Sequence, residues 1–209
     1  MWYWIKTPLI VKKIFHNQVW DIPSEKKNLY LTFDDGPTPG VTQEILSILS
    51  KYNAKATFFC IGKNVKKHPD LYNQIISSGN SFGNHSMTHP MGWGKSKKMY
   101  LKNIEEAEQL INSNLFRPPY GKINFKSNKA LQKKYNIIMW DVVGGDFDAN
   151  CSEDQLIKNI TESAVKGSII VLHDNLIVKE KTLSALPKII EILQKDSYTF
   201  EAIPFNPLR

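Results

Sequence analysis

The stretch LYLTFDDGP, residues 29–37, joins a predicted buried strand to a polar turn. Its first five residues are apolar, aromatic or β-branched, and the run stops at the turn sequence Asp-Asp-Gly-Pro. Residues 41–52 follow with apolar side chains at helical spacing. A strand that leads through a turn into a helix is the repeating unit of a parallel α/β fold.

The same alternation continues to the end of the chain. We expect further strands at residues 56–61, 81–82, 115–117, 137–140, 168–172 and 198–203. We expect helices at residues 69–78, 97–111, 127–135 and 152–165. Ser152 and Gln155 predict a capping box for the last of these, and Pro187 is expected in the first turn of a final helix. About seven βα units predict an α/β fold with a parallel sheet flanked by helices.

The composition is that of an ordinary globular protein with a sizeable core. Of 209 residues, 42% are hydrophobic and 22% charged, and 11 Gly and 11 Pro exclude a collagen-like or low-complexity chain. The net charge of +7 favours anionic surfaces or ligands without specifying one. The two cysteines, Cys60 and Cys151, are expected to be separate buried thiols.

The sequence contains no apolar run long enough to span a membrane. Its first residues also lack the uninterrupted apolar stretch and small-residue cleavage site of a signal peptide. We therefore expect a cytoplasmic or peripheral membrane protein rather than a secreted one.

Polar residues of catalytic type follow the ends of the predicted strands. They are Asp34 and Asp35, His85 and His89, the segment 117–120, Asp146, and His173 with Asp174. Because the carboxyl ends of parallel strands meet at one edge, these side chains are expected to converge there.

Histidines 85 and 89 are spaced so that one helical turn would direct both imidazoles to one metal ion. Alone, the pattern fits two surface or capping histidines equally well. No Glu follows His85, so this is not a zincin motif. The pair Asp34-Asp35 can supply one carboxylate ligand and one base, although alone it could be only a turn. Two histidines and one carboxylate suit catalytic zinc and also non-haem iron.

Five segments resemble, in order, the motifs of NodB-type polysaccharide deacetylases, carbohydrate esterase family four. They are TFDDGP (32–37), HSMTH (85–89), RPPY (117–120), WDVVGGDF (140–147) and VLHD (171–174). The resemblance covers about residues 28–203 and implies a distorted, incomplete (β/α) barrel of about seven parallel strands. We accordingly expect an N-terminal arm, residues 1–27, packed on a catalytic domain of residues 28–209.

The resemblance also implies roles for single residues. A divalent metal ion, zinc before any other, would be bound by Asp35, His85 and His89. Asp34 would be the general base and His173 the general acid.

Three further residues would assist this set. Arg117 would orient Asp34, the backbone N–H of Tyr120 would donate to the oxyanion, and Asp146 would steady the polar network. The fourth and fifth motifs depart from the family pattern, with Val143 for an aspartate, Phe147 for a tryptophan and Val171 for a leucine. In the family the residues at the positions of Phe147 and Val171 surround the acetyl methyl group, so the resemblance implies an apolar pocket of altered shape beside an intact catalytic set.

We expect Phe147, Val171 and Pro119 to line the substrate site. The leading hypothesis is a metal-dependent hydrolase that removes acetyl groups from N-acetylated amino sugars in a glycan or glycoconjugate. The metal would activate a water molecule, Asp34 would take its proton, and His173 would protonate the departing amine. The alternatives are an O-acetyl carbohydrate esterase with the same site and a non-catalytic glycan-binding homologue.

Nucleic acid is not expected as a partner. Basic residues are scattered, with short clusters such as Lys95, Lys97, Lys98 and Lys102, and no reader motif is present. Residues 1–15 mix aromatic and aliphatic side chains with lysines. They would either pack across the bottom or side of the barrel, where about seven strands leave a gap to be covered, or attach reversibly to an anionic membrane surface.

Overall fold

The computed structural model describes residues 3–94 and 96–205, so Trp2 and Lys95 lie outside the described residues. Its strands are β1 (Asn28–Asp34), β2 (Ala56–Cys60), β3 (Ser81–Asn84), β4 (Leu115–Phe116), β5 (Asn136–Ile137), β6 (Val142–Val143), β7 (Ile169–His173) and β8 (Thr199–Phe200). Its α-helices are α1 (Leu9–Ile14), α2 (Thr42–Lys51), α3 (Gly62–Lys67), α4 (Pro69–Ser77), α5 (Lys97–Glu108), α6 (Phe125–Leu131), α7 (Glu153–Ser163) and α8 (Lys179–Lys195).

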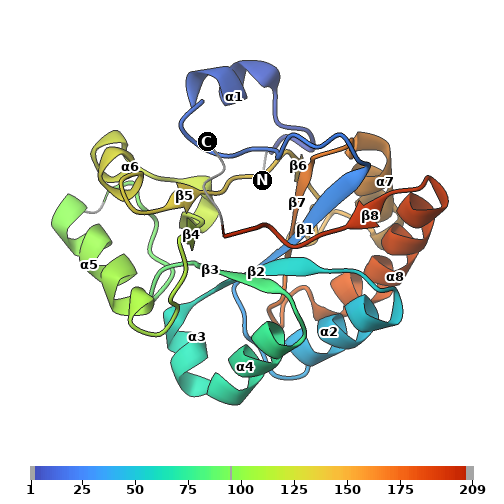
Figure 1. Ribbon diagram of the computed structural model, residues 1–209, viewed down its shortest axis with the longest axis horizontal. Coiled ribbons are helices and arrows are strands. Elements are labelled where there is room, and N and C mark those ends of the chain that lie inside the picture. Colours follow the sequence, from blue (N-terminus) through green and yellow to red (C-terminus); the bar gives the residue numbers. More distant parts are fainter. Residues whose placement is uncertain (1–2, 95, 206–209) are drawn as a thin grey trace.

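Seven strands form one curled parallel sheet in the order β5-β4-β3-β2-β1-β7-β6, and β8 pairs with β1. Figure 1 shows the strands curving around a common interior with helices on the outside. Going around the curve, β6 and β7 are followed by β1 to β5 in chain order, and the barrel stays open between β5 and β6. The prediction of an incomplete (β/α) barrel is confirmed.

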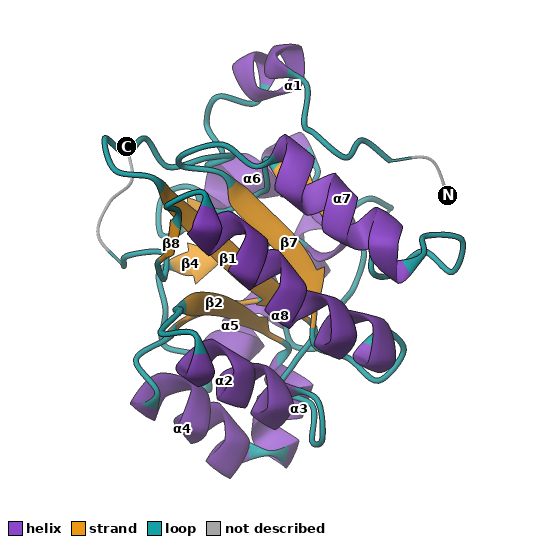
Figure 2. Ribbon diagram, turned by 90° about the vertical axis from the view of Figure 1, so that its right-hand side faces the viewer, coloured by secondary structure: helices purple, strands orange, loops and turns teal. Residues whose placement is uncertain are grey.

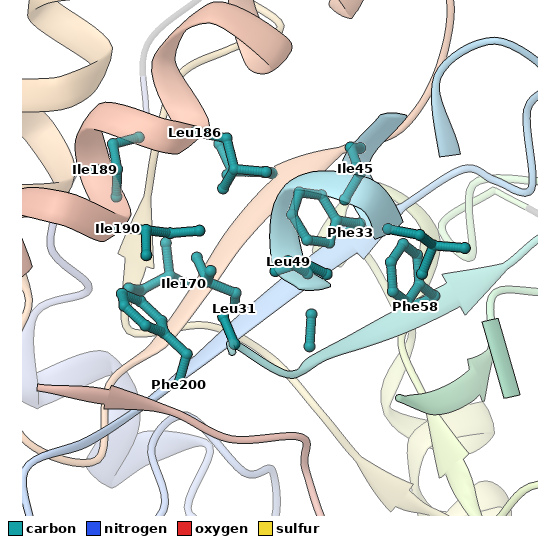
Figure 3. Close-up of a cluster of buried hydrophobic side chains, with 14 of the residues drawn as sticks. Leu31, Phe33, Ile45, Leu49, Phe58, Ile170, Leu186, Ile189, Ile190 and Phe200 are labelled. Atoms are coloured by element: carbon teal, nitrogen blue, oxygen red, sulfur yellow. The ribbon is translucent and has the colours of Figure 1, made fainter. Parts of the chain in front are cut away.

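Strand β1 is buried on both faces, and its alternation decides which residues reach the barrel interior. Leu31 and Phe33 point outward into the cluster formed with α2 and α8 (Figure 3). Tyr30, Thr32 and Asp34 point the opposite way, and all three are buried. Burying one large apolar side chain contributes roughly 1.5–3 kcal/mol, so the outward face fixes the register that brings Asp34 to the interior rim.

Helix α8 corrects one prediction. It begins at Lys179, so Pro187 lies inside the helix and not in its first turn. Proline removes one helical hydrogen bond there, but Leu186, Ile189 and Ile190 form a fully buried stripe on the same helix. The packing of that stripe outweighs the lost bond.

The predicted capping box is half formed. Ser152 Oγ accepts from the backbone N–H of Gln155 at 3.1 Å. The Gln155 side chain donates to Asn159 Oδ1 at 2.7 Å instead of returning to the helix start. Helix α3 and strand β6 were not predicted, because their six and two residues carry too little periodicity to be recognised. Cys60 and Cys151 are free and buried, as expected.

The N-terminal arm lies in the opening between β5 and β6. On one side, the N–H of Val143 donates to the carbonyl of Ile5 at 2.8 Å. On the other side, the N–H of Val19 donates to the carbonyl of Ile137 at 2.8 Å. Both edges of the sheet thereby gain backbone partners that an open edge would lack.

A buried carboxylate anchors this arm. Asp141 is 1% exposed and pairs with Lys6 and, at 2.6 Å, with Lys12, while Ser168 Oγ donates to it at 2.5 Å. Burial opposes the charged form, but the hydrogen bonds from Lys12 and Lys6 outweigh it and lower the pKa of Asp141.

Asp141→Asn is expected to lower the free energy of unfolding at pH 7 by about 2 kcal/mol, because two lysines lose a charged partner. Because folding lowers the pKa of Asp141, its ionised carboxylate stabilises the folded protein fully above about pH 4. This stabilisation is lost as the pH falls through the pKa of the folded state. Urea unfolding at pH 7 and at pH 3 measures both. Glu153→Gln, which removes the charge of a more exposed carboxylate that pairs with Lys188 and accepts from Ser184 Oγ, is the control and should cost much less. Equal losses in the two variants would contradict this role of Asp141.

Helix α1 in the arm leaves apolar side chains in water. Leu9, Ile10 and Ile14 are each more than half exposed, while Lys12 is engaged by Asp141 and Asp21. Among the described residues, no helix is long and apolar enough to cross a membrane. Membrane contact through residues 1–15 stays a prediction from the sequence.

Candidate active site

Parallel register carries the predicted catalytic residues to one rim of the barrel. Asp34 ends β1, His173 ends β7, and the two are directly paired across those neighbouring strands. His85 directly follows β3 and Arg117 directly follows β4, and these strands are also paired. In Figure 2 the arrowhead of β7 points away from α1, so this rim and α1 lie at opposite ends of the barrel.

Asp35, His85 and His89 present ligand atoms that all lie within 4.8 Å of one another. Asp35 Oδ1 is 3.2 Å from His89 Nε2 and 3.7 Å from His85 Nε2. This oxygen is buried and accepts no hydrogen bond from the described residues. A buried carboxylate oxygen without a donor, facing two imidazole nitrogens, fits a cation as its missing partner.

Neighbouring groups orient these ligands. His85 Nδ1 is 2.8 Å from the carbonyl oxygen of Arg117, which can only accept, so the ring proton sits on Nδ1 and Nε2 keeps its lone pair. Asn175 Nδ2 donates to Asp35 Oδ2 at 2.8 Å. Burial and the nearby His85 lower the pKa of His89, which favours the neutral imidazole that binds metals. Burial would raise the pKa of Asp35, but electrostatic attraction to the nearby His85 and His173, together with the hydrogen bond from Asn175, outweighs burial and lowers it.

The segment from His85 to His89 is a loop, which corrects the prediction of a helical turn. Ser86 and His89 both adopt positive φ, at 69° and 56°. Side chains hold this conformation, because Asn84 Oδ1 accepts from the N–H of Ser86 and Ser86 Oγ accepts from the N–H of His89. The imidazoles still converge, with ring centroids 4.9 Å apart. Asp35 also has positive φ, at 84°, an unfavourable conformation that separates its side chain from that of Asp34.

Arg117 is the largest fully buried side chain and holds Asp34 in place. Its Nη1 donates at 2.7 Å both to Asp34 Oδ1 and to Thr32 Oγ1. The remaining donors reach the carbonyls of Ile138 at 3.2 Å and Met139 at 2.9 Å. Burial lowers the pKa of Arg117, but from so high a value that the guanidinium stays charged. Asp34 Oδ2 remains within 4.0 Å of His85 Nε2, on the side of the candidate metal ligands.

His173 lies opposite Asp34 and is held by Asp146. Its Nδ1 is 3.0 Å from Asp146 Oδ1, and its backbone N–H donates to Asp146 Oδ2 at 2.7 Å. Burial lowers the pKa of His173, but the charge and hydrogen bond of Asp146 outweigh burial and raise it to about 9. The side chain is 19% exposed, so a protonated imidazole with one accessible edge faces the rim.

The predicted apolar residues lie around these polar groups. The rings of Phe147 and His173 form a T-shaped pair, with centroids 5.5 Å apart. Val171 lies two residues before His173 on the same face of β7 and is buried. Pro119 is buried, and beside it Tyr120 has φ of 59° and lays its ring against His89, with centroids 4.6 Å apart.

The sequence placed Asp174 at the rim without giving it a role, and it did not single out Asn175 or Tyr3. Asp174 is fully buried, its pKa is raised by burial to about 7, and Thr42 Oγ1 donates to it at 2.6 Å. A Cβ on Gly36 would fall 2.0 Å from Asp174 Oδ2, which explains the glycine of the DDGP turn. Asn175 supports Asp35, and the ring of Tyr3 from the arm packs on Phe147 at 5.0 Å. The sequence HDN, residues 173–175, was the only available signal for Asp174 and Asn175, and no sequence pattern pointed to Tyr3.

Known proteins are similar to this chain in sequence and in fold. The family described as "Polysaccharide deacetylase" matches residues 21–137. A peptidoglycan-N-acetylglucosamine deacetylase of Bacillus cereus is 33% identical over 193 residues, which cover 88% of this chain and 90% of that protein. A chitooligosaccharide deacetylase of Rhizobium leguminosarum bv. trifolii is 29% identical over 199 residues, covering 87% and 92%.

A solved structure supports the same assignment over nearly the whole chain. The Bc1960 peptidoglycan N-acetylglucosamine deacetylase superposes with a TM-score of 0.87 at 30% identity, and 95% of each chain is covered. Family and barrel thus agree with the resemblance carried by the five motifs, and the chain belongs to the polysaccharide deacetylase family.

Proposed function

We propose that this protein is a metal-dependent hydrolase that removes acetyl groups from N-acetylated amino sugars in a glycan. One observation carries the proposal. The ligand atoms of Asp35, His85 and His89 converge at the rim, where Asp34 Oδ2 lies 4.0 Å from His85 Nε2 and His173 is the direct strand partner of Asp34. The peptidoglycan and chitooligosaccharide deacetylases to which the chain is similar support the substrate class.

The donor set of Asp35, His85 and His89 fits a divalent cation, and we propose Zn²⁺. Two imidazoles and one carboxylate with open positions form a common catalytic zinc site. When bound, the ion supplies Lewis-acid chemistry, because it lowers the pKa of a water molecule and polarises the acetyl carbonyl.

Asp34 accepts the proton of the attacking water. Arg117 occupies Asp34 Oδ1 at 2.7 Å, which leaves Oδ2 directed to the ligand side. The base is therefore held in one orientation before substrate binds, and a positioned base contributes roughly 10²–10⁴-fold to the rate. The backbone N–H of Tyr120 donates to the developing oxyanion, and one such donor is worth about 3 kcal/mol.

His173 donates a proton to the departing amine nitrogen. An amine is a poor leaving group unless protonated, so amide hydrolysis needs this acid. Asp146 fixes Nδ1 and so presents Nε2 to the substrate. We propose that Phe147, Val171 and Pro119 surround the acetyl methyl group and exclude water from it.

The pH dependence follows from the His173–Asp146 pair. The pKa of His173 is raised to about 9, so it stays protonated through neutral pH and kcat is expected to fall on the alkaline side. A bound divalent cation lowers that pKa by its charge, which puts the alkaline limb at or below about pH 9. Asp146→Asn removes the raising charge, so its limb should move at least one pH unit lower. Because folding raises the pKa of His173, its pair with Asp146 stabilises the folded protein fully below about pH 6.5. This stabilisation is lost as the pH rises through about 9. A pH profile of kcat that is identical in both proteins would contradict this assignment of the acid.

Acetate release tests the function and separates the alternatives. Zinc-loaded protein is assayed on N-acetylglucosamine oligomers and on acetylated xylan. Faster release from the amino-sugar oligomers supports the proposal, whereas faster release from xylan favours an O-acetyl esterase. Bound metal without release from any acetylated glycan would favour a non-catalytic homologue.

A further inference from the structure

Two chain segments leave the candidate active site side by side. Residues 89–94 start at His89, and residues 120–126 start at Tyr120, whose rings are in contact. Farther out, the N–H of Gly92 donates to the carbonyl of Lys122 at 3.1 Å, and Asn124 Nδ2 donates to the carbonyl of Gly92 at 3.1 Å. The two segments form one continuous surface that runs from the metal ligands toward α5 and α6.

Three large aromatic side chains are exposed along this surface. Tyr120 and Trp93 are each 57% exposed, and Phe125 is 78% exposed. Lys122 Nζ lies 5.6 Å from the centroid of the Trp93 ring. Single exposed aromatics are ordinary, but several along one path from an active site indicate a binding surface. Flat aromatic faces with a polar rim suit sugar rings, which are apolar on their faces and polar at their edges.

The surface ends in a groove of about 380 Å³ between α5 and α6. It is lined by Lys97, Phe125, Lys126, Lys129, Ala130 and Lys133. Four of these six residues are lysines, none is acidic, and within the described part of the chain none of the four forms an ion pair. Unpaired lysines gathered in a groove give it a positive potential that attracts anionic groups.

We propose that this aromatic and basic track, which consists of Tyr120, Trp93, Lys122 and the groove, binds a carboxylate-bearing glycan strand. The proposal rests on the proposed function, because it takes the strand to be the substrate whose acetylated sugar occupies the site. A neutral glycan has no charge for the lysines to pair with, whereas carboxylates along the strand would meet them. From Tyr120 to Phe125 the chain spans at most about 18 Å, so the track can follow a strand of a few sugars.

Carboxylates are favoured over phosphates as the anions, because the lysines are continuous with a row of exposed aromatic side chains. A phosphate polymer would also be attracted to the lysines, but phosphates alone give no reason for three aromatics that begin at the metal ligands. Carboxylates attached to amino sugars account for both features on one strand. The track therefore selects among N-acetylated glycans by their charge.

Binding to two tetrasaccharides tests the proposal. One alternates N-acetylglucosamine with N-acetylmuramic acid and carries carboxylates, and the other is neutral chitotetraose. All proteins carry Asp34→Asn, which prevents turnover during calorimetry. The track variant adds Lys97→Gln, Lys122→Gln and Lys126→Gln. The control variant instead adds Lys51→Gln, Lys66→Gln and Lys195→Gln, three exposed lysines of α2, α3 and α8 that lose the same charge.

The parent protein is expected to bind the carboxylate-bearing tetrasaccharide about tenfold more tightly than chitotetraose at low salt, a difference of about 1.4 kcal/mol. The track variant should lose this preference and the control variant should keep it. Raising the salt to about 0.5 M should weaken only the charged ligand. An unchanged preference in the track variant, or no preference in the parent, overturns the proposal.

A Trp93→Ala variant tests the aromatic part separately. It should weaken binding of both tetrasaccharides by a similar factor of several-fold, because stacking does not depend on charge. Unchanged binding of chitotetraose would remove Trp93 from the track. Failure of the proposed function is distinguishable from these outcomes, since it shows as intact binding without acetate release by the protein with Asp34 present.

Discussion

Asp34→Asn is expected to lower kcat for acetate release from an N-acetylglucosamine oligomer by about 10³-fold without changing the metal content. The amide has the shape of the carboxylate, and its oxygen can still accept the 2.7 Å hydrogen bond from Arg117. It cannot accept a proton from water, which removes the positioned base. The proposed metal ligands are not changed, so metal binding should survive.

The measurement combines steady-state kinetics with elemental analysis of the purified protein. Asp196→Asn, an exposed carboxylate at the end of α8, is the matched control and should keep normal kcat. A variant that retains more than a tenth of the kcat would show that Asp34 is not the base. Loss of the metal in Asp34→Asn would instead make this side chain a ligand.

Arg117→Met should lower the free energy of unfolding by about 3–5 kcal/mol, the largest stability effect expected in this chain. The guanidinium is completely buried and donates to Asp34, Thr32 and two backbone carbonyls. Methionine fills much of the volume against Phe59, whose ring centroid lies 4.1 Å from the guanidinium carbon. The variant therefore leaves a buried carboxylate unpaired, and that uncompensated charge carries most of the cost.

A double-mutant cycle in urea separates charge from packing. Adding Asp34→Asn to Arg117→Met should recover part of the lost stability, because the unpaired charge disappears. If the double variant is as unstable as the sum of the two single variants, the ion pair is not the source of the loss. Catalysis gives a second reading, since Arg117→Met frees the orientation of Asp34 and should lower kcat even at temperatures where the variant is folded.

The catalytic residues at the rim of the barrel could be predicted from the sequence, because each follows a short apolar run that can be recognised without knowing the tertiary structure. An apolar run that ends in two aspartates, and another that ends in His173, define two parallel strands with polar ends. Parallel register then pairs Asp34 with His173 without further assumptions. The same reasoning located Arg117 directly after its strand. Asp146 was expected after a strand at residues 137–140, whereas in the structure it follows β6, which was not predicted.

Local patterns could not predict features that depend on tertiary contacts. The loop around His89 needs positive φ at two residues, which is stabilised by Asn84 and Ser86 side chains and is invisible to spacing rules. Pro187 is tolerated inside α8 only because that helix buries a stripe against β1 and β7. The support of Phe147 by Tyr3 depends on the docking of the arm, which residue order does not encode.

Titration of zinc into chelator-stripped protein, with acetate release from chitotetraose as the readout, tests the central claim most directly. The metal-free protein should be inactive, and the rate should rise linearly and saturate at one zinc ion per chain, because Asp35, His85 and His89 define a single site. A protein carrying His89→Ala should need a large excess of zinc for any rate. Full acetate release by protein that elemental analysis shows to be free of metal would contradict the account.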